Sequence, residues 1–202
     1  MKSNEIRALL QHTWEIEAQE INRLKEVTDL VKVSECVRVI AACKARIITA
    51  GVGTSGAAAK KIAHSLSCIE RPAFFLSPGD AVHGALGAIQ KGDVVIAISK
   101  GGNTREIVNL IPAIQTKKAY LIGVTENGDS ILGRQSDLWL KVKVEKEPDD
   151  FNMLATASTM AVIAVFDAVC IALMRYTGYT RKQFAVIHPG GAVGERLLNN
   201  KK

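Results

Sequence analysis

The chain has 202 residues and a formal net charge of +6. That length suits a single domain with a full hydrophobic core, which we expect to span residues 1–202. The positive charge is spread along the chain, with no run of five Lys or Arg residues and no row of aromatic residues for stacking on bases. We therefore expect small anions as partners, and no nucleic acid.

The cysteines and the apolar segments indicate a cytoplasmic protein. The four cysteines are widely spaced, without a CxxC pair, which favours reduced core residues over metal ligands or disulfides. The N-terminus is charged and polar, unlike a secretory signal. The longest apolar stretch, residues 161–174, contains Asp167 and is expected to be too short for a membrane span.

Residues 3–31 carry apolar side chains at helical spacing and predict one long amphipathic helix, with a second helix over residues 34–43. We expect these helices, within residues 1–45, to pack on the core or on a neighbouring subunit. Strand and helix patterns then alternate. The expected strands are residues 46–50, 73–76, 93–98, 119–124 and 137–142. The expected helices are residues 57–68, a short one holding His83, then 104–115, 152–176 and 180–186.

This alternation predicts an α/β fold in three layers, a five-stranded parallel sheet with right-handed crossovers and helices on both faces. Ligands of such sheets bind at the carboxyl ends of the strands. Two glycine-rich loops, residues 51–56 and 99–104, fall at that edge. We therefore expect the functional site there.

The loop after the third expected strand has the build of an anion site. Backbone N–H groups at a helix start attract anions, and the helix dipole adds to this attraction. Ser99 and Thr104 offer hydroxyl donors, while Lys100 is either a point charge for the anion or a solvated side chain. Glycines let the backbone fold around the anion. The candidate residues in this loop are Ser99, Lys100, Gly101, Gly102, Asn103 and Thr104.

Glu106 stands in the first turn of the helix that follows this loop. A carboxylate slightly opposes anion binding, so its presence suggests chemistry beside a phosphate. The alternative is an ordinary acidic residue at a helix start.

The first loop reads Gly51-Val52-Gly53-Thr54-Ser55-Gly56 and fits the start of a dinucleotide motif. A nicotinamide site also needs an acid at the end of the next strand, where the nearest one is Asp80, beyond a Pro-Gly turn. We favour phosphate binding through the Ser55 hydroxyl and the backbone. A dinucleotide site, or a glycine turn needed only for close packing, remains as an alternative.

Other polar residues fall near the same edge. His83 follows a strand end, and His188 precedes a rigid Pro-Gly-Gly turn, so both are candidates for function rather than only for structure. Glu147 lies in an acidic loop after the last strand. Most such loops are simply solvated, but this one falls at the carboxyl edge of the sheet, which makes Glu147 a candidate as well. Neither a metal-binding spacing nor a GxSxG motif is present, so we expect no metal, no other cofactor and no serine hydrolase. Three hydroxyls begin the long apolar helix, those of Thr156, Ser158 and Thr159.

Together, the motifs at residues 51–56, 78–84, 99–106 and 188–194 resemble the sugar isomerase (SIS) domain family, and its arabinose-5-phosphate isomerases most closely. The resemblance covers nearly the whole chain. It implies a flavodoxin-like sheet, a sugar-phosphate ligand and a homo-oligomer, expected to be a homotetramer, whose sites are shared between subunits.

The resemblance also implies roles for single residues. Glu106 matches the catalytic glutamate after the phosphate loop, Glu147 the second acid, and His83 and His188 the two histidines. The implied phosphate-binding hydroxyls belong to Ser55, Ser99 and Thr104. Gly53 and Thr54 complete the candidate binding set.

Two positions depart from the isomerase pattern. The isomerases usually have Lys where this chain has Thr54, and a second hydroxyl in the phosphate loop is replaced here while Lys100 is gained. We hypothesise that Lys100 supplies the missing cation. The longer isomerases also carry paired CBS modules, and regulation through such modules is not expected from these residues.

The expected activity is an aldose–ketose isomerase that interconverts D-arabinose 5-phosphate and D-ribulose 5-phosphate through a cis-enediol. Glu106 or Glu147 would be the base, with a pKa raised by partial burial, while His188 moves protons or opens the ring and His83 positions the substrate. The alternatives are isomerisation of another sugar phosphate, or a non-catalytic phosphosugar-binding regulator. Residues 1–45 lack a helix-turn-helix pattern, which disfavours the regulator.

Overall fold

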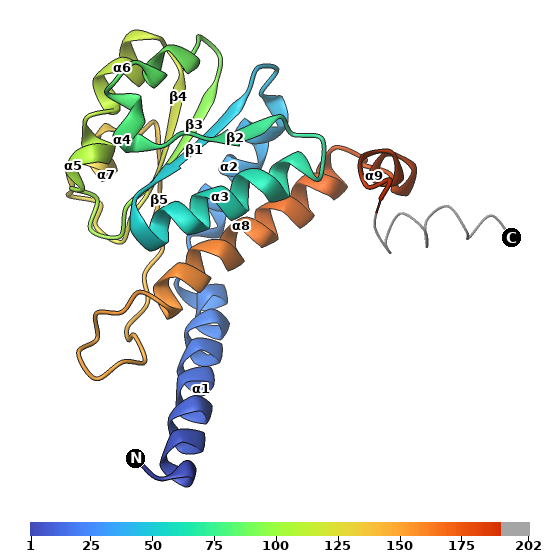
Figure 1. The fold of residues 1–202 in the computed structure, drawn as a ribbon. Coiled ribbons are helices and arrows are strands. Elements are labelled where there is room, and N and C mark those ends of the chain that lie inside the picture. Colours follow the sequence, from blue (N-terminus) through green and yellow to red (C-terminus); the bar gives the residue numbers. More distant parts are fainter. Residues whose placement is uncertain (191–202) are drawn as a thin grey trace, which may run out of the picture.

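A computed structural model describes residues 1–190 and places five parallel strands in one sheet (Figure 1). The strand order is β2-β1-β3-β4-β5, the order of flavodoxin-like folds. The expected α/β fold is therefore confirmed, and each expected strand is present with ends that move by up to two residues. The strands are β1 (Ile47–Gly51), β2 (Ala73–Phe75), β3 (Val94–Ile98), β4 (Tyr120–Val124) and β5 (Leu138–Leu140).

Helices cover both faces of the sheet. Alternate residues of β3 enter different cores: Ile96 packs under α2, α3 and α8, whereas Val95 and Ala97 pack under the short helices of the other face. On the first face lie α1 (Ser3–Val27), α2 (Leu30–Ala42), α3 (Gly53–Ser67) and α8 (Ala157–Tyr176). On the second lie α4 (Pro78–Ala81), the 3-10 helix η1 (Ala85–Ala88), α5 (Arg105–Val108), α6 (Ile111–Thr116) and α7 (Ile131–Gln135). The last described helix is α9 (Arg181–Ile187).

Two helices that we predicted to be continuous are broken. The predicted helix over residues 3–31 ends at Val27, because the Asp29 carboxylate accepts hydrogen bonds from Val31 and Lys32 and starts α2 anew. The predicted helix over residues 104–115 is divided into α5 and α6. Pro112 in the first turn of α6 cannot donate a backbone hydrogen bond to the preceding turn.

The apolar stretch of the long helix is longer than the expected residues 161–174. α8 has 20 residues, and a window of 18 of them has a mean hydropathy of 2.1, so by length and composition alone it could cross a membrane. In the structure it packs lengthwise against α3 and also contacts α1 and α2 (Figure 1). Its Asp167 forms an ion pair with Lys61 of α3. These contacts favour a core helix over a membrane span.

The start of β3 is held by a buried carboxylate whose loss should destabilise the fold. Asp93 is fully buried and accepts hydrogen bonds from the backbone N–H groups of Arg46 and Gln90 and from the Arg46 guanidinium. We expect Asp93→Ala to lower the free energy of unfolding by about 3 kcal/mol, because these donors lose their acceptor. Urea denaturation measures the change. Asp150→Ala, at an exposed position, is the control, and equal stability of the two variants would contradict the prediction.

Candidate functional site

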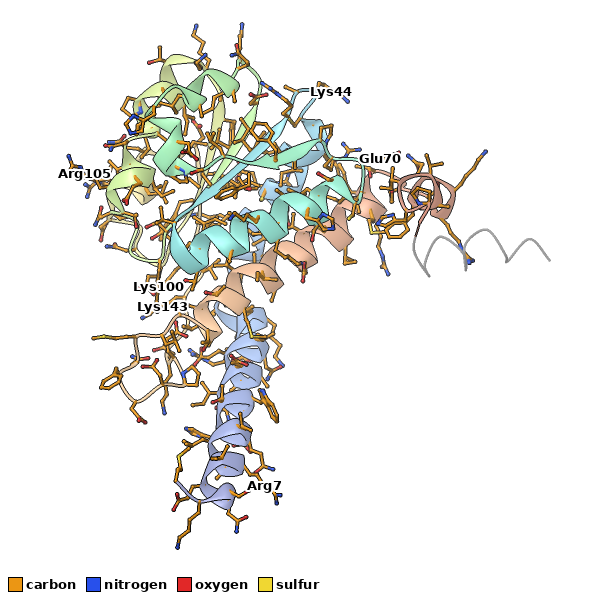
Figure 2. The ribbon with its side chains drawn as sticks, viewed as in Figure 1. Arg7, Lys44, Glu70, Lys100, Arg105 and Lys143 are labelled. Carbon is orange, nitrogen blue, oxygen red and sulfur yellow. The ribbon has the colours of Figure 1, made fainter. Side chains whose placement is uncertain are left out.

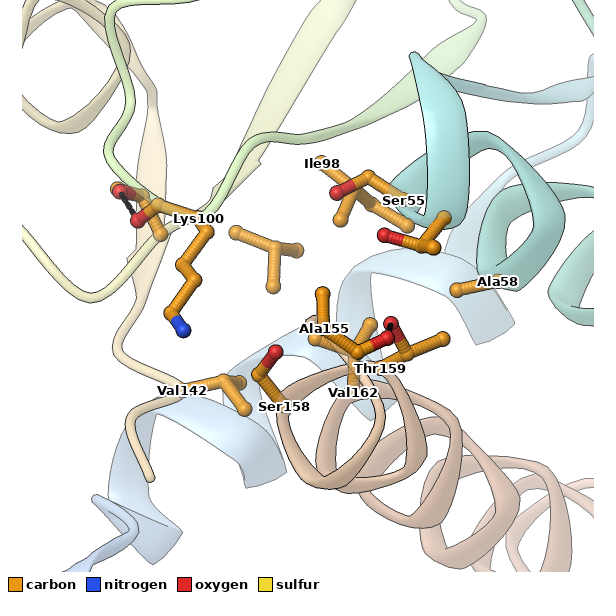
Figure 3. Close-up of a pocket in the computed structure, with 12 residues that line it drawn as sticks. Ser55, Ala58, Ile98, Lys100, Val142, Ala155, Ser158, Thr159 and Val162 are labelled. Atoms are coloured by element: carbon orange, nitrogen blue, oxygen red, sulfur yellow. Dashed lines mark hydrogen bonds between the residues drawn. The ribbon is translucent and has the colours of Figure 1, made fainter. Parts of the chain in front are cut away.

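A polar pocket opens at the carboxyl edge of the sheet, where the first turns of α3 and α8 face the end of β3 (Figure 3). It holds about 460 Å³ of space, part of it open to solvent. Its apolar wall comes from residues such as Ile98 and Val162. Its polar groups come from Thr54, Ser55, Lys100, Thr125, Ser158 and Thr159. The pocket therefore combines hydroxyl groups, one ammonium and two helix N-termini.

The first loop serves both packing and the pocket. A Cβ atom on Gly51 would lie 2.5 Å from the Ser55 carbonyl oxygen, and one on Gly56 would lie 2.8 Å from the Gly51 carbonyl oxygen. These two glycines therefore allow the strand and the helix to approach closely. Gly53 begins α3 with a φ of +58°, a conformation that favours glycine. Thr54 and Ser55, in contrast, line the pocket (Figure 3).

The second loop is organised by a buried hydroxyl. Ser99 is 3% exposed, and its Oγ lies 2.8 Å from Thr104 Oγ1 and accepts a hydrogen bond from the Gly102 N–H. Within residues 1–190, the backbone N–H groups of Gly101 and Asn103 have no hydrogen-bond acceptor. They remain available to an anion, which a phosphate loop would require. Asn103 uses its side chain differently, because its Oδ1 accepts a hydrogen bond from Ile131 of α7.

The helix after this loop is much shorter than predicted. α5 has only 4 residues, so it offers free N–H groups but only a small macrodipole. The longer helices α3 and α8 bring their N-termini to the pocket instead. The helix dipoles at this edge therefore come mainly from α3 and α8 rather than from α5, the helix that follows the second loop.

Two adjacent glycines in the loop offer a matched test of its geometry. A Cβ on Gly102, which has a φ of +74°, would lie 2.0 Å from Ser130 Oγ, whereas one on Gly101 would meet nothing within 4 Å. We expect Gly102→Ala to destabilise the protein by about 2 kcal/mol and to abolish phosphate binding, because the loop must shift. Gly101→Ala should leave both nearly unchanged. Thermal unfolding measures the stability of the two variants, and calorimetric titration measures their phosphate affinity. Equal stability and equal affinity of the two variants would contradict the prediction.

The acid after the last strand is buried against the pocket. Glu147 has no exposed surface, and its Oε1 accepts a hydrogen bond from Lys100 Nζ at 2.9 Å. Its Oε2 accepts hydrogen bonds from the backbone N–H groups of Thr156 and Ser158, at the start of α8. The carboxylate therefore caps α8 and pairs with the pocket's ammonium at the same time.

These contacts change the proton affinity of Glu147. Burial acts to raise its pKa, but the hydrogen bonds from Ser158, Lys100 and Thr156 together outweigh burial and hold the pKa below its ordinary value. A general base near neutral pH needs a raised pKa instead. Of the two candidate bases, Glu147 is thus the less suited in this arrangement.

The other candidate base lies in a second hollow, on the opposite side of the first turn of α3. Glu106 is exposed on α5 and lines this hollow with Gly53 and Lys60 of α3 and with Ser77 and Gly79 before and within α4. The two glutamates therefore flank the same helix start. A ligand that lies across this start meets the Glu106 carboxylate in the second hollow, whereas the Glu147 carboxylate is buried behind Lys100.

The two candidate histidines lie in different places. His83 is exposed just after α4, on the face that carries α5, and its ring makes no hydrogen bond with residues 1–190. His188 lies beyond α9, where its ring stacks on Phe184. This end of the chain is fixed to the far end of α3 through the Tyr179 hydroxyl, which donates a hydrogen bond to the Cys68 carbonyl oxygen. Because α3 has 15 residues, its far end lies about 20 Å from the helix start that lines the pocket, and α9, which precedes His188, lies beyond that end (Figure 1).

Comparison with known proteins decides the family. The family model for the SIS domain matches residues 40–172. The chain belongs to the SIS domain family. The motif that follows His188 continues past residue 190 and lies outside the described residues.

Relatives of this SIS chain include known isomerases. It is 38% identical to arabinose 5-phosphate isomerase KdsD of Francisella tularensis, over 92% of this chain and 58% of that protein. The chain thus spans about half the length of the curated relatives it matches. A Listeria monocytogenes protein named among the sugar-phosphate isomerases is 58% identical, with a TM-score of 0.93 over 94% of this chain and 100% of that one. Escherichia coli CFT073 c3406, solved in complex with arabinose 5-phosphate, is 32% identical with a TM-score of 0.89 over the same shares.

Within this SIS domain, one polar residue of the pocket was missed from the sequence. Thr125 follows β4 directly and lines the pocket, and its hydroxyl donates a hydrogen bond to the Lys100 carbonyl oxygen. A polar residue at the carboxyl end of a central strand is a signal that could have identified it. Among residues 1–190 no group of three or more His, Cys, Asp or Glu side chains is arranged to hold a metal ion.

Proposed function

We propose that this SIS protein is an aldose–ketose isomerase of phosphorylated sugars that interconverts D-arabinose 5-phosphate and D-ribulose 5-phosphate. The observation that carries the proposal is an anion loop with open N–H groups beside a pocket that holds the Lys100 ammonium, with the Glu106 carboxylate in a second hollow at the same start of α3. The isomerase names of its relatives and the complex of one of them with arabinose 5-phosphate support the substrate class.

The reaction needs a base that takes the proton beside the carbonyl carbon and returns it to the neighbouring carbon. We assign this role to Glu106, because its carboxylate is exposed to the second hollow and is not paired with a cation in the described structure. The proton leaves one carbon, the electron pair forms the enediol double bond, and the carbonyl oxygen gains a proton. Reversal at the neighbouring carbon gives the other sugar.

The phosphate group supplies binding energy that positions the reacting carbons. We assign its binding to the loop at Gly101–Thr104, the hydroxyls of Ser55 and Thr104, and Lys100. Lys100 and Thr54 line the same pocket, which supports the hypothesis that Lys100 provides the cation absent at position 54. Ser99 then acts by holding the loop rather than by direct contact.

We propose that the site is completed by a second copy of the chain. His188 follows α9 beyond the far end of α3, which lies about 20 Å from the pocket-lining start of that helix, so we infer that His188 serves a site in a neighbour. Exposed apolar side chains support association, since the outer half of α1 projects from the body beside the loop after Glu147 (Figures 1 and 2). They include Leu9, Leu10, Trp14, Phe151 and Met153.

We further propose a homotetramer in the cytoplasm, with residues 1–202 acting as one domain and with no metal, nucleic acid or membrane as partner. His83 would position the substrate. The resemblance and the core position of α8 support these assignments.

A substrate panel tests the activity. Purified protein is incubated with pentose, hexose, hexulose and sedoheptulose phosphates, each at one concentration, and the products are identified by NMR. We expect conversion of D-arabinose 5-phosphate to be fastest. If only another sugar phosphate is converted, the proposed substrate is wrong. If none is converted, the proposed isomerase activity is refuted.

A further inference from the structure

The ion pair between Lys100 and Glu147 places an internal anion on the cation of the pocket. Among the described residues that line the pocket, Lys100 carries the only formal positive charge. Its Nζ lies 2.9 Å from Glu147 Oε1, and the Lys100 side chain is 41% exposed while that of Glu147 is fully buried. Figure 3 shows the Lys100 side chain extending across the pocket toward Ser158. The ammonium that an anion would seek is therefore already paired.

The two partners differ in freedom of movement. Glu147 is fixed on its other oxygen by two backbone N–H groups of α8, and its own N–H donates to Asn152 Oδ1 at 2.6 Å. Lys100 makes no other side-chain hydrogen bond within residues 1–190, and its flexible stem lies in the pocket. When a second anion competes, Lys100 is the partner that can move.

A phosphate dianion is a strong competitor for this ammonium. The hydroxyls of Ser55 and Thr54 and the open N–H groups of the neighbouring loop add donors that Glu147 cannot reach. The Glu147 carboxylate keeps its two α8 donors after Lys100 leaves, so the exchange does not leave a buried charge without hydrogen bonds.

We propose that Glu147 is a built-in competitor of the ligand: the phosphate of the substrate displaces its carboxylate from Lys100, so that Glu147 sets how tightly the pocket holds anions. Glu147 is thus a positioning residue that acts through Lys100. This inference rests on the proposed function in one respect, namely that the phosphate which displaces Glu147 belongs to a sugar phosphate. Its consequence is that the pocket holds phosphate less tightly than its donors allow, which favours product release.

Calorimetric titration with inorganic phosphate tests the competition directly. We expect Glu147→Gln to bind phosphate about fivefold more tightly than the wild-type protein, because Lys100 is released from its partner. Lys100→Met should bind phosphate more weakly. The double variant should match Lys100→Met, since without Lys100 there is no cation to release.

Glu145→Gln is the matched control. It removes one negative charge two residues away, from a side chain that is 59% exposed and pairs with Arg23, so it should leave phosphate affinity unchanged. Should Glu147→Gln fail to fold, Glu147→Asp keeps a carboxylate for α8 and withdraws it from Lys100, and tighter binding is again expected.

Unchanged or weaker phosphate binding by a folded Glu147→Gln protein, or tightening in the double variant, would overturn the proposal. Phosphate binding can be measured without turnover, so the proposed competition and the proposed isomerase activity are tested independently of each other. A wild-type protein that converts no sugar phosphate refutes the isomerase, whereas an active enzyme without tightening in Glu147→Gln refutes the competition.

Discussion

Glu106→Gln should lower kcat by about a thousandfold while leaving the affinity for sugar phosphate nearly unchanged. The amide keeps the size of the side chain but cannot take the proton beside the carbonyl. Because Glu106 is exposed on α5, the substitution removes no buried contact and should not change stability. Initial rates of isomerisation and calorimetric binding measure the two quantities separately.

The control for this variant is Glu126→Gln. Glu126 follows β4 at the same edge of the sheet, and its side chain makes no hydrogen bond within residues 1–190. This substitution should leave kcat within about twofold of wild type. If Glu106→Gln keeps comparable activity, the base lies elsewhere, and Glu147 becomes the first residue to examine.

Mixed oligomers of two inactive variants should regain activity. Glu106→Gln subunits carry an intact His188, and His188→Asn subunits carry an intact Glu106. If each site takes its histidine from a neighbour, random mixing restores about a quarter of the sites. Co-expression with two affinity tags, purification through both tags and an isomerase assay measure the recovery.

The matched control pairs Glu106→Gln subunits with subunits that carry both Glu106→Gln and His188→Asn. No site in that mixture contains an intact Glu106, so no activity should return. Activity of the first mixture equal to the sum of its two parent proteins would show that His188 does not serve a neighbouring site.

The sheet could be predicted from the sequence because its signals are local. Runs such as Val94–Ile98 are apolar throughout, as strands buried on both faces must be, and turns separate them from helical patterns. Helix boundaries were harder. The break at Asp29 depends on a side-chain cap, and α7 depends on Ser130 and on Asn103, which lies far away in sequence.

Most polar residues of the candidate site could be proposed from the sequence, but not how they pair. Glycine and hydroxyl patterns identified both loops, since these residue types are needed for backbone anion binding. The contact between Lys100 and Glu147 joins residues 47 positions apart and follows from the tertiary fold alone. The same holds for the lowered pKa of Glu147, which depends on donors at the start of α8. The distance of His188 from the pocket is likewise a property of the assembled helices.

Isomerisation in D₂O tests the central proposal most directly. D-arabinose 5-phosphate is incubated with the wild-type protein, and the ketose product is followed by ¹H and ²H NMR. An enediol mechanism with an exchanging carboxylate base predicts D-ribulose 5-phosphate that carries solvent deuterium at C1. Recovery of D-arabinose 5-phosphate without ketose and without deuterium at C2 would contradict the account, because no proton would have been taken from the carbon beside the carbonyl.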